Sequence, residues 1–117
     1  MIQIFPAEKR YIQRMGWLDV YSVFSCNNYF DPWNTHFANL IAFNEYVMQP
    51  GFGFNMHPHE DIEQVFLVTE GQLSHADSLG NEGVLSPGGI QSISAGSGYA
   101  RYACNRGDAP CRYLAAW

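Results

Sequence analysis

Two histidines separated by a single residue, His57 and His59, have a spacing that is suited to metal chemistry. Side chains alternate along an extended chain, so both imidazoles would lie on one side of a strand and could reach the same ion. Glu63 follows four residues after His59 and could supply a carboxylate if the intervening loop folds back. Such a set with open positions suits iron, manganese, nickel or copper. The alternative is that each histidine only forms a hydrogen bond to a backbone group.

Strands are the elements that would have to position these histidines. The 117 residues include 8 Phe, 7 Tyr and 3 Trp, which favour strands, and 11 Gly and 6 Pro, which punctuate short segments. Apolar runs between turn signals predict strands near residues 17–24, 39–48, 64–69, 72–76, 84–85, 90–94, 99–103 and 112–116. Five aromatic residues are expected in the core: Trp17, Phe24, Tyr29, Phe30 and Trp33. The pattern predicts an all-β chain folded as a sandwich or barrel of antiparallel strands.

Charge and cysteine content exclude several functional classes. The net charge of −5 leaves no basic field to attract nucleic acid directly. Cys26, Cys104 and Cys111 are odd in number and lack a CxxC spacing, which argues against structural zinc and a disulfide framework. A reducing cytoplasm fits this cysteine usage. The apolar stretches are too short to span a bilayer and the N-terminus does not read as a signal peptide, so we expect no membrane partner.

The histidine pair lies within a longer pattern of glycine and acidic residues. Gly51 lies six residues before His57 and Gly71 follows downstream, an arrangement that resembles the first motif of the cupin superfamily. More specifically, the chain resembles the pirin family in these segments: Phe30-Asp31-Pro32, His57-Pro58-His59 with Glu63, Glu70-Gly71, His75, Asp77-Ser78-Leu79-Gly80-Asn81, Pro87-Gly88 and Ser94-Ala95-Gly96-Ser97-Gly98. The resemblance covers residues 16–117 and is to the N-terminal cupin domain of bacterial pirin-like proteins.

This resemblance implies a cupin-type jelly roll, in which two antiparallel sheets enclose a central cavity. We expect residues 1–117 to form a single cupin domain. Pirin-like proteins usually carry two cupin domains in tandem, so the chain is either a single-domain relative or one part of a two-cupin protein. A lone domain would expose the apolar surface that normally packs on the second domain, and we therefore expect a homodimer.

The resemblance also implies a set of metal ligands, of which this chain matches only half. In the pirin family the two histidines of the pair are joined by a histidine and a glutamate shortly after the Ser-Ala-Gly-x-Gly stretch. These four positions correspond to His57, His59, Arg101 and Ala103 here. Arginine stays protonated and has no lone pair to offer, and alanine has no ligand atom, so the metal site is degenerate. Replacement ligands could come from Glu63, Cys104, His36 or His75, and the other outcome is a cavity without metal.

Arg101 is expected to change the chemistry of the cavity. A guanidinium there is a permanent positive charge in a partly dry pocket, and burying it unpaired is costly. The nearest acidic residue by motif is Glu63, so we expect an Arg101–Glu63 ion pair in place of the metal, with His57 and His59 as hydrogen-bonding groups. The alternative is that Arg101 extends into solvent at the mouth of the barrel.

Two functions remain open from the sequence. The leading interpretation is a pirin-like cupin that binds a small ligand or a protein partner, since the resemblance implies partners such as transcription regulators. The alternative is a metal-dependent dioxygenase of the quercetinase type, which would open flavonols with dioxygen and needs a redox-capable metal. The candidate metal ligands are His57 and His59, and the candidate cofactor-binding residues are Glu63 and Arg101. Whether the chain is an enzyme, and with which catalytic residues, is open at this point.

Overall fold

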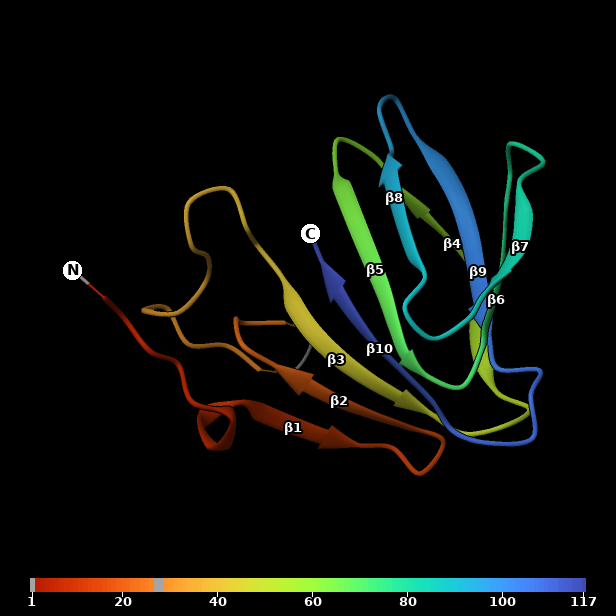
Figure 1. Cartoon of the computed structure of the whole chain (residues 1–117). Helices are drawn as coiled ribbons and strands as arrows, with labels where there is room; N and C mark the ends of the chain where they lie inside the picture. Colours follow the sequence, from red (N-terminus) through yellow and green to blue (C-terminus); the bar gives the residue numbers. More distant parts are fainter. Residues whose placement is uncertain (1, 27–28) are drawn as a thin grey trace.

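The chain folds into two antiparallel β-sheets that face each other (Figure 1). The computed structural model describes residues 2–26 and 29–117. Six strands form one sheet in the order β1 (Tyr11–Arg14), β2 (Leu18–Ser22), β3 (Phe43–Met48), β10 (Cys111–Ala116), β5 (Glu63–Glu70) and β8 (Ile90–Ser94). Four strands form the other in the order β4 (Gly53–His59), β9 (Tyr99–Cys104), β6 (Leu73–Asp77) and β7 (Glu82–Leu85).

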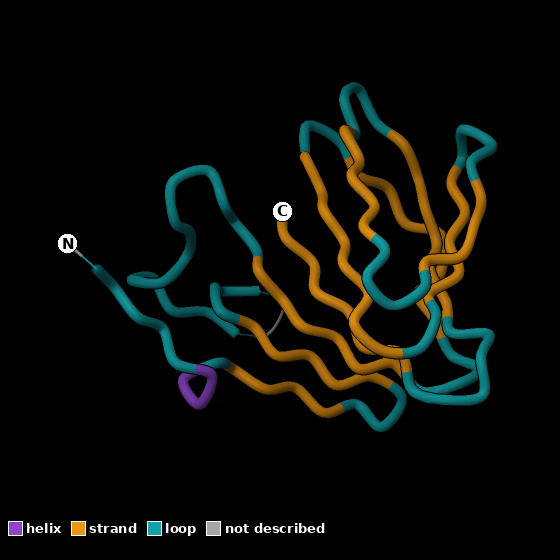
Figure 2. Tube along the Cα trace, viewed as in Figure 1, coloured by secondary structure: helices purple, strands orange, loops and turns teal. Residues whose placement is uncertain are grey.

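Nearly all of the regular structure is strand (Figure 2). The helical part of the described residues is a single three-residue turn, η1 (Ala7–Lys9). The described residues therefore contain no helix that is long and apolar enough to cross a membrane. The prediction of an all-β chain with antiparallel strands is confirmed.

The main differences between the predicted and the observed strands are at β1, β3 and β4, and β4 was expected only as extended chain around the two histidines. The strand expected from residue 39 begins only at Phe43, because Phe37 and Leu40 pair with each other in a tight isolated bridge before it. Strand β1 was not predicted at all. It pairs along its length with β2 at the edge of the larger sheet. Most of its side chains are exposed, so its sequence lacks the alternation of apolar and polar residues that would have predicted a strand.

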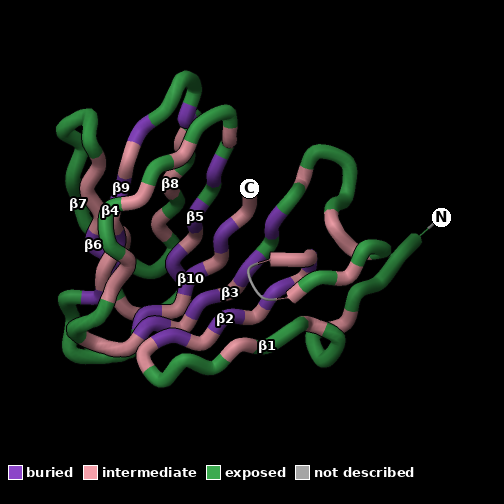
Figure 3. Tube along the Cα trace, turned by 180° about the vertical axis from the view of Figure 1, so that it is seen from behind, coloured by how far each residue is buried: buried purple, intermediate pink, exposed green. Residues whose placement is uncertain are grey.

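The core lies between the sheets and is built by strands whose residues alternate between buried and partly exposed (Figure 3). Met48, Val68, Leu73 and Cys111 are completely buried, and they come from β3, β5, β6 and β10. Fully burying each large apolar side chain contributes about 1.5–3 kcal/mol. The same alternation that fills this core also decides which polar side chains face inward.

The aromatic residues near the N-terminus are only partly in the core. Phe24 is buried and Trp17 packs against the core cluster, as predicted. Phe30 and Trp33 are 75% and 95% exposed, so the expectation that they are core residues is wrong. Their loop is held by polar contacts instead of burial: the Asp31 carboxylate accepts a hydrogen bond from the Trp33 backbone N–H at 3.0 Å.

Candidate functional site

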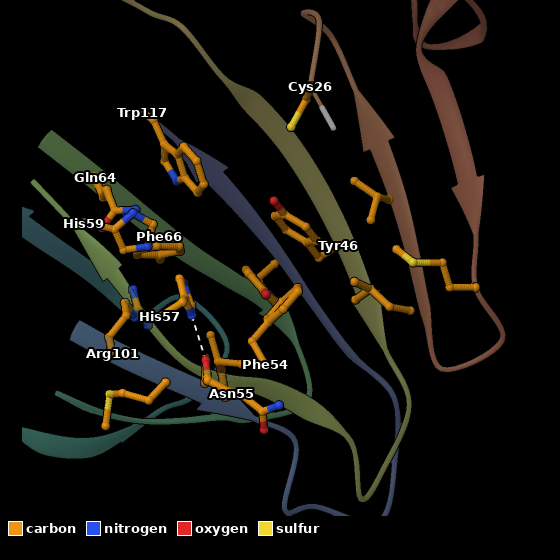
Figure 4. Close-up of a pocket in the computed structure, with 17 residues that line it drawn as sticks. Cys26, Tyr46, Phe54, Asn55, His57, His59, Gln64, Phe66, Arg101 and Trp117 are labelled. Atoms are coloured by element: carbon orange, nitrogen blue, oxygen red, sulfur yellow. Dashed lines mark hydrogen bonds between the residues drawn. The ribbon is translucent and has the colours of Figure 1, made fainter. Parts of the chain in front are cut away.

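A cavity of about 390 Å³ lies between the two sheets (Figure 4). Most of its lining is apolar or aromatic and comes from Leu18, Val20, Tyr46, Phe54, Phe66, Leu73 and Tyr113. Met15 and Met56 also line the cavity and are about half exposed, at 48% and 51%, so the cavity reaches the surface on that side. Such a concave and mainly apolar space with a few polar groups is typical of a small-molecule site.

His57 and His59 lie on β4 and both line the cavity. Their register partners on β9 are Arg101 and Tyr99, and directly opposed residues of an antiparallel pair point to the same face. The pairing of β4 with β9 is irregular between Phe54 and His57, which shows a bulge just before the histidines. The two imidazole rings meet edge to face, with centroids 4.6 Å apart.

Hydrogen bonding sets the tautomer of His57, and burial affects the protonation of His59. Nδ1 of His57 lies 2.8 Å from the backbone carbonyl of Asn55, and since a carbonyl only accepts, Nδ1 donates. The ring of His59 packs edge-on against Trp117, with centroids 5.4 Å apart, and its Nε2 is buried without a partner among the described residues. Burial, followed by the charges of His57 and Arg101, lowers the pKa of His59, so its neutral form is favoured.

Arg101 lines the cavity from β9 and is only 4% exposed. The structure thus places its guanidinium inside, beside the histidines, and not in solvent at the mouth (Figure 4). Its Cζ lies 4.2 Å from the centroid of the Phe66 ring, a cation–π contact. Its Nη1 and Nη2 atoms have no hydrogen-bond partner among the described residues. Burial is the main cause that lowers the pKa of Arg101, although arginine remains charged at neutral pH.

Glu63 does not belong to the cavity, so the expected Arg101–Glu63 ion pair is wrong. Glu63 is exposed on the outer face of β5, where its Oε1 accepts a hydrogen bond from Ser94 Oγ at 2.7 Å. The next residue, Gln64, points inward, because neighbours along a strand face opposite sides. Strand β5 therefore adds an amide, and not a carboxylate, to the cavity that the histidines line.

Gln64 is a polar cavity residue that the sequence pattern did not single out. It is 1% exposed, and its Oε1 accepts a hydrogen bond from the Tyr99 hydroxyl at 2.5 Å. Its Nε2 is buried and has no partner among the described residues. The alternation of Gln64 with the buried Phe66 and Val68 was the signal that could have identified it.

The other candidate ligands lie elsewhere. Ala103 faces the cavity but has no ligand atom, and Cys104 falls on the opposite side of β9 by alternation. His36 is exposed and its Nδ1 contacts the Thr35 hydroxyl at 2.9 Å. His75 does not line the cavity, and its Nδ1 lies 3.2 Å from Nε2 of Gln91.

A comparison of the chain with protein families identifies its family. The pirin family model matches residues 6–117 of the chain. The chain belongs to the pirin family. One curated relative is the quercetin 2,3-dioxygenase of Escherichia coli K12, which is 41% identical over 98 residues covering 84% of this chain and 42% of that protein. The chain spans about half the length of the curated relatives that it matches.

Solved structures show that this pirin-family chain has the cupin fold. The crystal structure of YhhW from Escherichia coli matches with a TM-score of 0.92 and 35% identity, covering 96% of this chain and 48% of that one. A second structure, of bacterial pirin YhhW in complex with nickel(II), matches with a TM-score of 0.88, 36% identity, and 94% and 48% coverage. An RmlC-like cupin with a double-stranded β-helix fold from Methanocaldococcus jannaschii, 11% identical with a TM-score of 0.56 over 64% of this chain and 66% of that one, shows the shared fold alone. The predicted family and cupin-type fold are confirmed.

The nickel in YhhW raises the question of whether this pirin-family chain could hold a metal. Among the residues that the structure describes, no group of three or more His, Cys, Asp or Glu side chains is arranged to hold an ion. The register partner of His57 is instead Arg101, whose buried guanidinium carries a positive charge. Two histidines beside a fixed cation do not fit a divalent metal.

Proposed function

We propose that this pirin-family cupin is a binding domain with a degenerate metal site, and that it takes a small molecule into its cavity without a metal ion. The observation that supports this most is Arg101, which lies beside His57 at the position that the family resemblance assigns to a third ligand. A second unit charge of the same sign 4 Å away costs about 4 kcal/mol at an effective dielectric constant of about 20, and a divalent ion doubles this.

The second candidate function is a quercetinase-type dioxygenase. Relatives that are 34–43% identical to the chain are named "Quercetin 2,3-dioxygenase" or "Putative quercetin 2,3-dioxygenase", which favours this function. The reaction needs a redox-capable metal with open coordination positions. The chain offers His57 and His59 for that purpose, and neither Arg101 nor Ala103 can complete the set.

Metal analysis and oxygen uptake together decide between the two functions. The protein would be purified without chelator, its iron, nickel, copper and manganese content measured by mass spectrometry, and its oxygen consumption followed with quercetin. The Escherichia coli relative, handled identically, is the positive control. We expect a metal content well below one ion per chain and no uptake. About one ion per chain together with turnover would establish the dioxygenase and overturn the proposal.

The proposal also covers where the chain acts and which surface binds a partner. The chain is proposed to act in the cytoplasm, which its free cysteines Cys26, Cys104 and Cys111 support. A protein partner or a second copy of the chain is proposed to bind the exposed aromatic side chains Phe30, Trp33 and Phe37, which are 75%, 95% and 66% exposed.

A further inference from the structure

The buried polar atoms of the cavity that lack a partner are mainly hydrogen-bond donors. Nη1 and Nη2 of Arg101, Nε2 of Gln64 and Nε1 of Trp117 are all buried without a partner among the described residues. All three side chains line the cavity, together with His59, whose unpartnered Nε2 donates or accepts according to its tautomer. Unpaired buried donors are costly, above all on a cation, so the cavity is suited to a ligand that accepts hydrogen bonds.

No carboxylate of the described residues lies in this donor cluster or forms an ion pair with Arg101. The described lining of the cavity contains neither Asp nor Glu, and none of the ion pairs among the described residues includes Arg101. Asp77 is the register partner of Arg101 on β6, but its carboxylate accepts hydrogen bonds from the backbone N–H groups of Leu79 and Asn81 and from Nδ2 of Asn81. These contacts, at 2.9 to 3.0 Å, commit both oxygens to the turn after β6.

We propose that the cavity binds small carboxylic acids as their anions, with the carboxylate paired to Nη1 and Nη2 of Arg101 and hydrogen-bonded to Nε2 of Gln64. A guanidinium presents parallel N–H groups in a planar fork that matches the two oxygens of a carboxylate. This inference rests on the proposed function and deepens it, because it names the chemical class of the ligand.

Neighbouring side chains hold both donors in place. The Arg101 guanidinium lies over the Phe66 ring, with 4.2 Å between Cζ and the ring centroid, and this cation–π contact helps to hold it. The hydroxyl of Tyr99 occupies Oε1 of Gln64 and leaves the amide nitrogen as the free end. Preorganised donors of this kind favour binding because little side-chain freedom is lost.

The rest of the cavity determines which apolar part of the ligand fits. Beyond Arg101 and Gln64 the lining is mostly apolar and includes the aromatic rings of Tyr46, Phe54 and Tyr113. A volume of about 390 Å³ accommodates an aromatic ring with a short acidic side arm. We therefore expect aromatic monocarboxylates to bind better than acetate, which lacks an apolar body, or inorganic phosphate, which is tetrahedral.

Calorimetric titration of the full chain with matched acids and amides tests the proposal. Phenylacetate and benzoate would be compared with phenylacetamide and benzamide, which have nearly the same shape and no charge, and with acetate and inorganic phosphate. The expected result is that each aromatic acid binds at least about tenfold more tightly than its amide, the difference that one charged hydrogen-bonded pair provides. Equal binding of acids and amides, tighter binding of phosphate, or no binding of any acid would overturn the proposal.

Three variants assign the binding to the proposed atoms. Arg101→Met removes the charge at similar length and should weaken binding of phenylacetate at least about tenfold. Arg106→Met is the matched control, because Arg106 is exposed and contacts the Tyr102 hydroxyl, and it should leave binding unchanged. Gln64→Glu puts a carboxylate into the cavity that Arg101 lines, so it should repel the anion and abolish binding while keeping the chain folded. This second cavity variant keeps the test decisive if Arg101→Met fails to fold.

The outcomes separate this inference from the proposed function. If Arg101→Met or Gln64→Glu folds and binds phenylacetate as tightly as the natural chain, the carboxylate site is wrong. If the amides bind as well as the acids, the cavity still binds small molecules and only the ligand class is wrong. If the protein carries one metal ion per chain and consumes oxygen with quercetin, the proposed function fails and this inference fails with it.

Discussion

At the scale of single residues, Arg101 puts a buried cation in the cavity, at the position where the family resemblance implies a metal-binding histidine. Its position follows from the alternation of β9, in which Tyr99, Arg101 and Ala103 are buried and face inward. The side chain at this position therefore has to contribute to the cavity, whatever its type. A histidine there could donate a lone pair, whereas arginine contributes a permanent charge and N–H donors.

Restoring the family's ligand set should restore metal binding. The double variant Arg101→His, Ala103→Glu places four candidate ligands on the adjacent strands β4 and β9, because Arg101 pairs with His57 and Ala103 with Phe54. We expect the affinity for nickel(II), measured by calorimetry, to rise at least about tenfold over that of the natural chain.

The matched control for this variant moves the same side chains to the other face of β9. Tyr102→His, Cys104→Glu adds the same ligand types one residue along, where alternation directs them away from the cavity. We expect the natural affinity for nickel(II) from this control. A natural chain that already binds nickel(II) as tightly as Arg101→His, Ala103→Glu would contradict the idea that arginine replaces the metal.

His75 should make folding depend on pH. Burial is the main cause that lowers its pKa below the usual 6.5, the charge of Arg101 adds to this effect, and the charge of Asp77 opposes it. Folded His75 then binds its proton more weakly than unfolded His75, so the free energy of unfolding should rise as the pH increases toward about 6.5 and then level off. Urea denaturation from about pH 5 to pH 8 measures this slope.

Replacing His75 should reduce that slope. His75→Gln removes the group that changes charge, so the free energy of unfolding should rise less steeply with pH than in the natural chain. His36→Gln is the control, because His36 is an exposed loop residue. Identical slopes for the natural chain and His75→Gln would show that His75 does not couple to folding.

At the scale of elements, the connection from β5 to β6 carries a strict requirement at Gly71. Its φ is +72°, in the left-handed region that favours glycine. A Cβ there would lie 2.5 Å from the backbone oxygen of Pro110, just before β10, so rigid backbone would have to move. The turn lets the chain pass from the larger sheet to the smaller one while remaining packed against β10.

Gly71→Ala should therefore destabilise the fold more than an ordinary glycine substitution. We expect a loss of about 3 kcal/mol in the free energy of unfolding, from the combination of backbone strain and the clash with Pro110. Gly80→Ala is the matched control, since Gly80 also has a positive φ, +88°, but nothing within 4 Å of its Cβ position. That variant should lose about 1 kcal/mol. Equal losses in urea denaturation would mean that the contact with Pro110 is unimportant.

The elements also show how far the sequence could predict the site. Period-two alternation was enough to predict that His57 and His59 share a face, because both lie on one strand. The role given to Glu63 failed because its spacing from His59 was weighed above the alternation of its own strand, which directs Gln64 inward. The hydrogen bond from Tyr99 to Gln64 joins two residues from different sheets, and no local pattern in the sequence reveals such a contact.

At the scale of the whole molecule, residues 29–42, which lead into β3, extend from the two-sheet body (Figure 1). The radius of gyration over Cα atoms is 14.4 Å, slightly above the roughly 13 Å expected for a compact chain of this length. Large apolar side chains are exposed on this segment, namely Phe30, Trp33, Phe37 and Ile41, and Phe43 at the start of β3 is also exposed. Exposed apolar clusters on monomers commonly mark interaction surfaces.

We therefore expect the chain to self-associate through this surface. Sedimentation velocity at tens of micromolar should show a homodimer, and Trp33→Ser combined with Phe37→Ser should shift it to a monomer. Leu79→Ser is the control, because Leu79 is 71% exposed and lies in the turn after β6, outside that segment. A natural chain that sediments as a monomer, or a dimer unaffected by the double substitution, would contradict this expectation.

Because Trp117 lines the cavity, its fluorescence is an intrinsic probe of whether the cavity is occupied. The three tryptophans occupy different environments: Trp117 lines the cavity, Trp17 packs beside Phe54, and Trp33 is almost fully exposed. Iodide, which is excluded from protein interiors, would quench the fluorescence of Trp33 first and leave the emission of the two shielded indoles. A molecule entering the cavity would contact the indole of Trp117 and change its emission, so occupancy can be followed without labels.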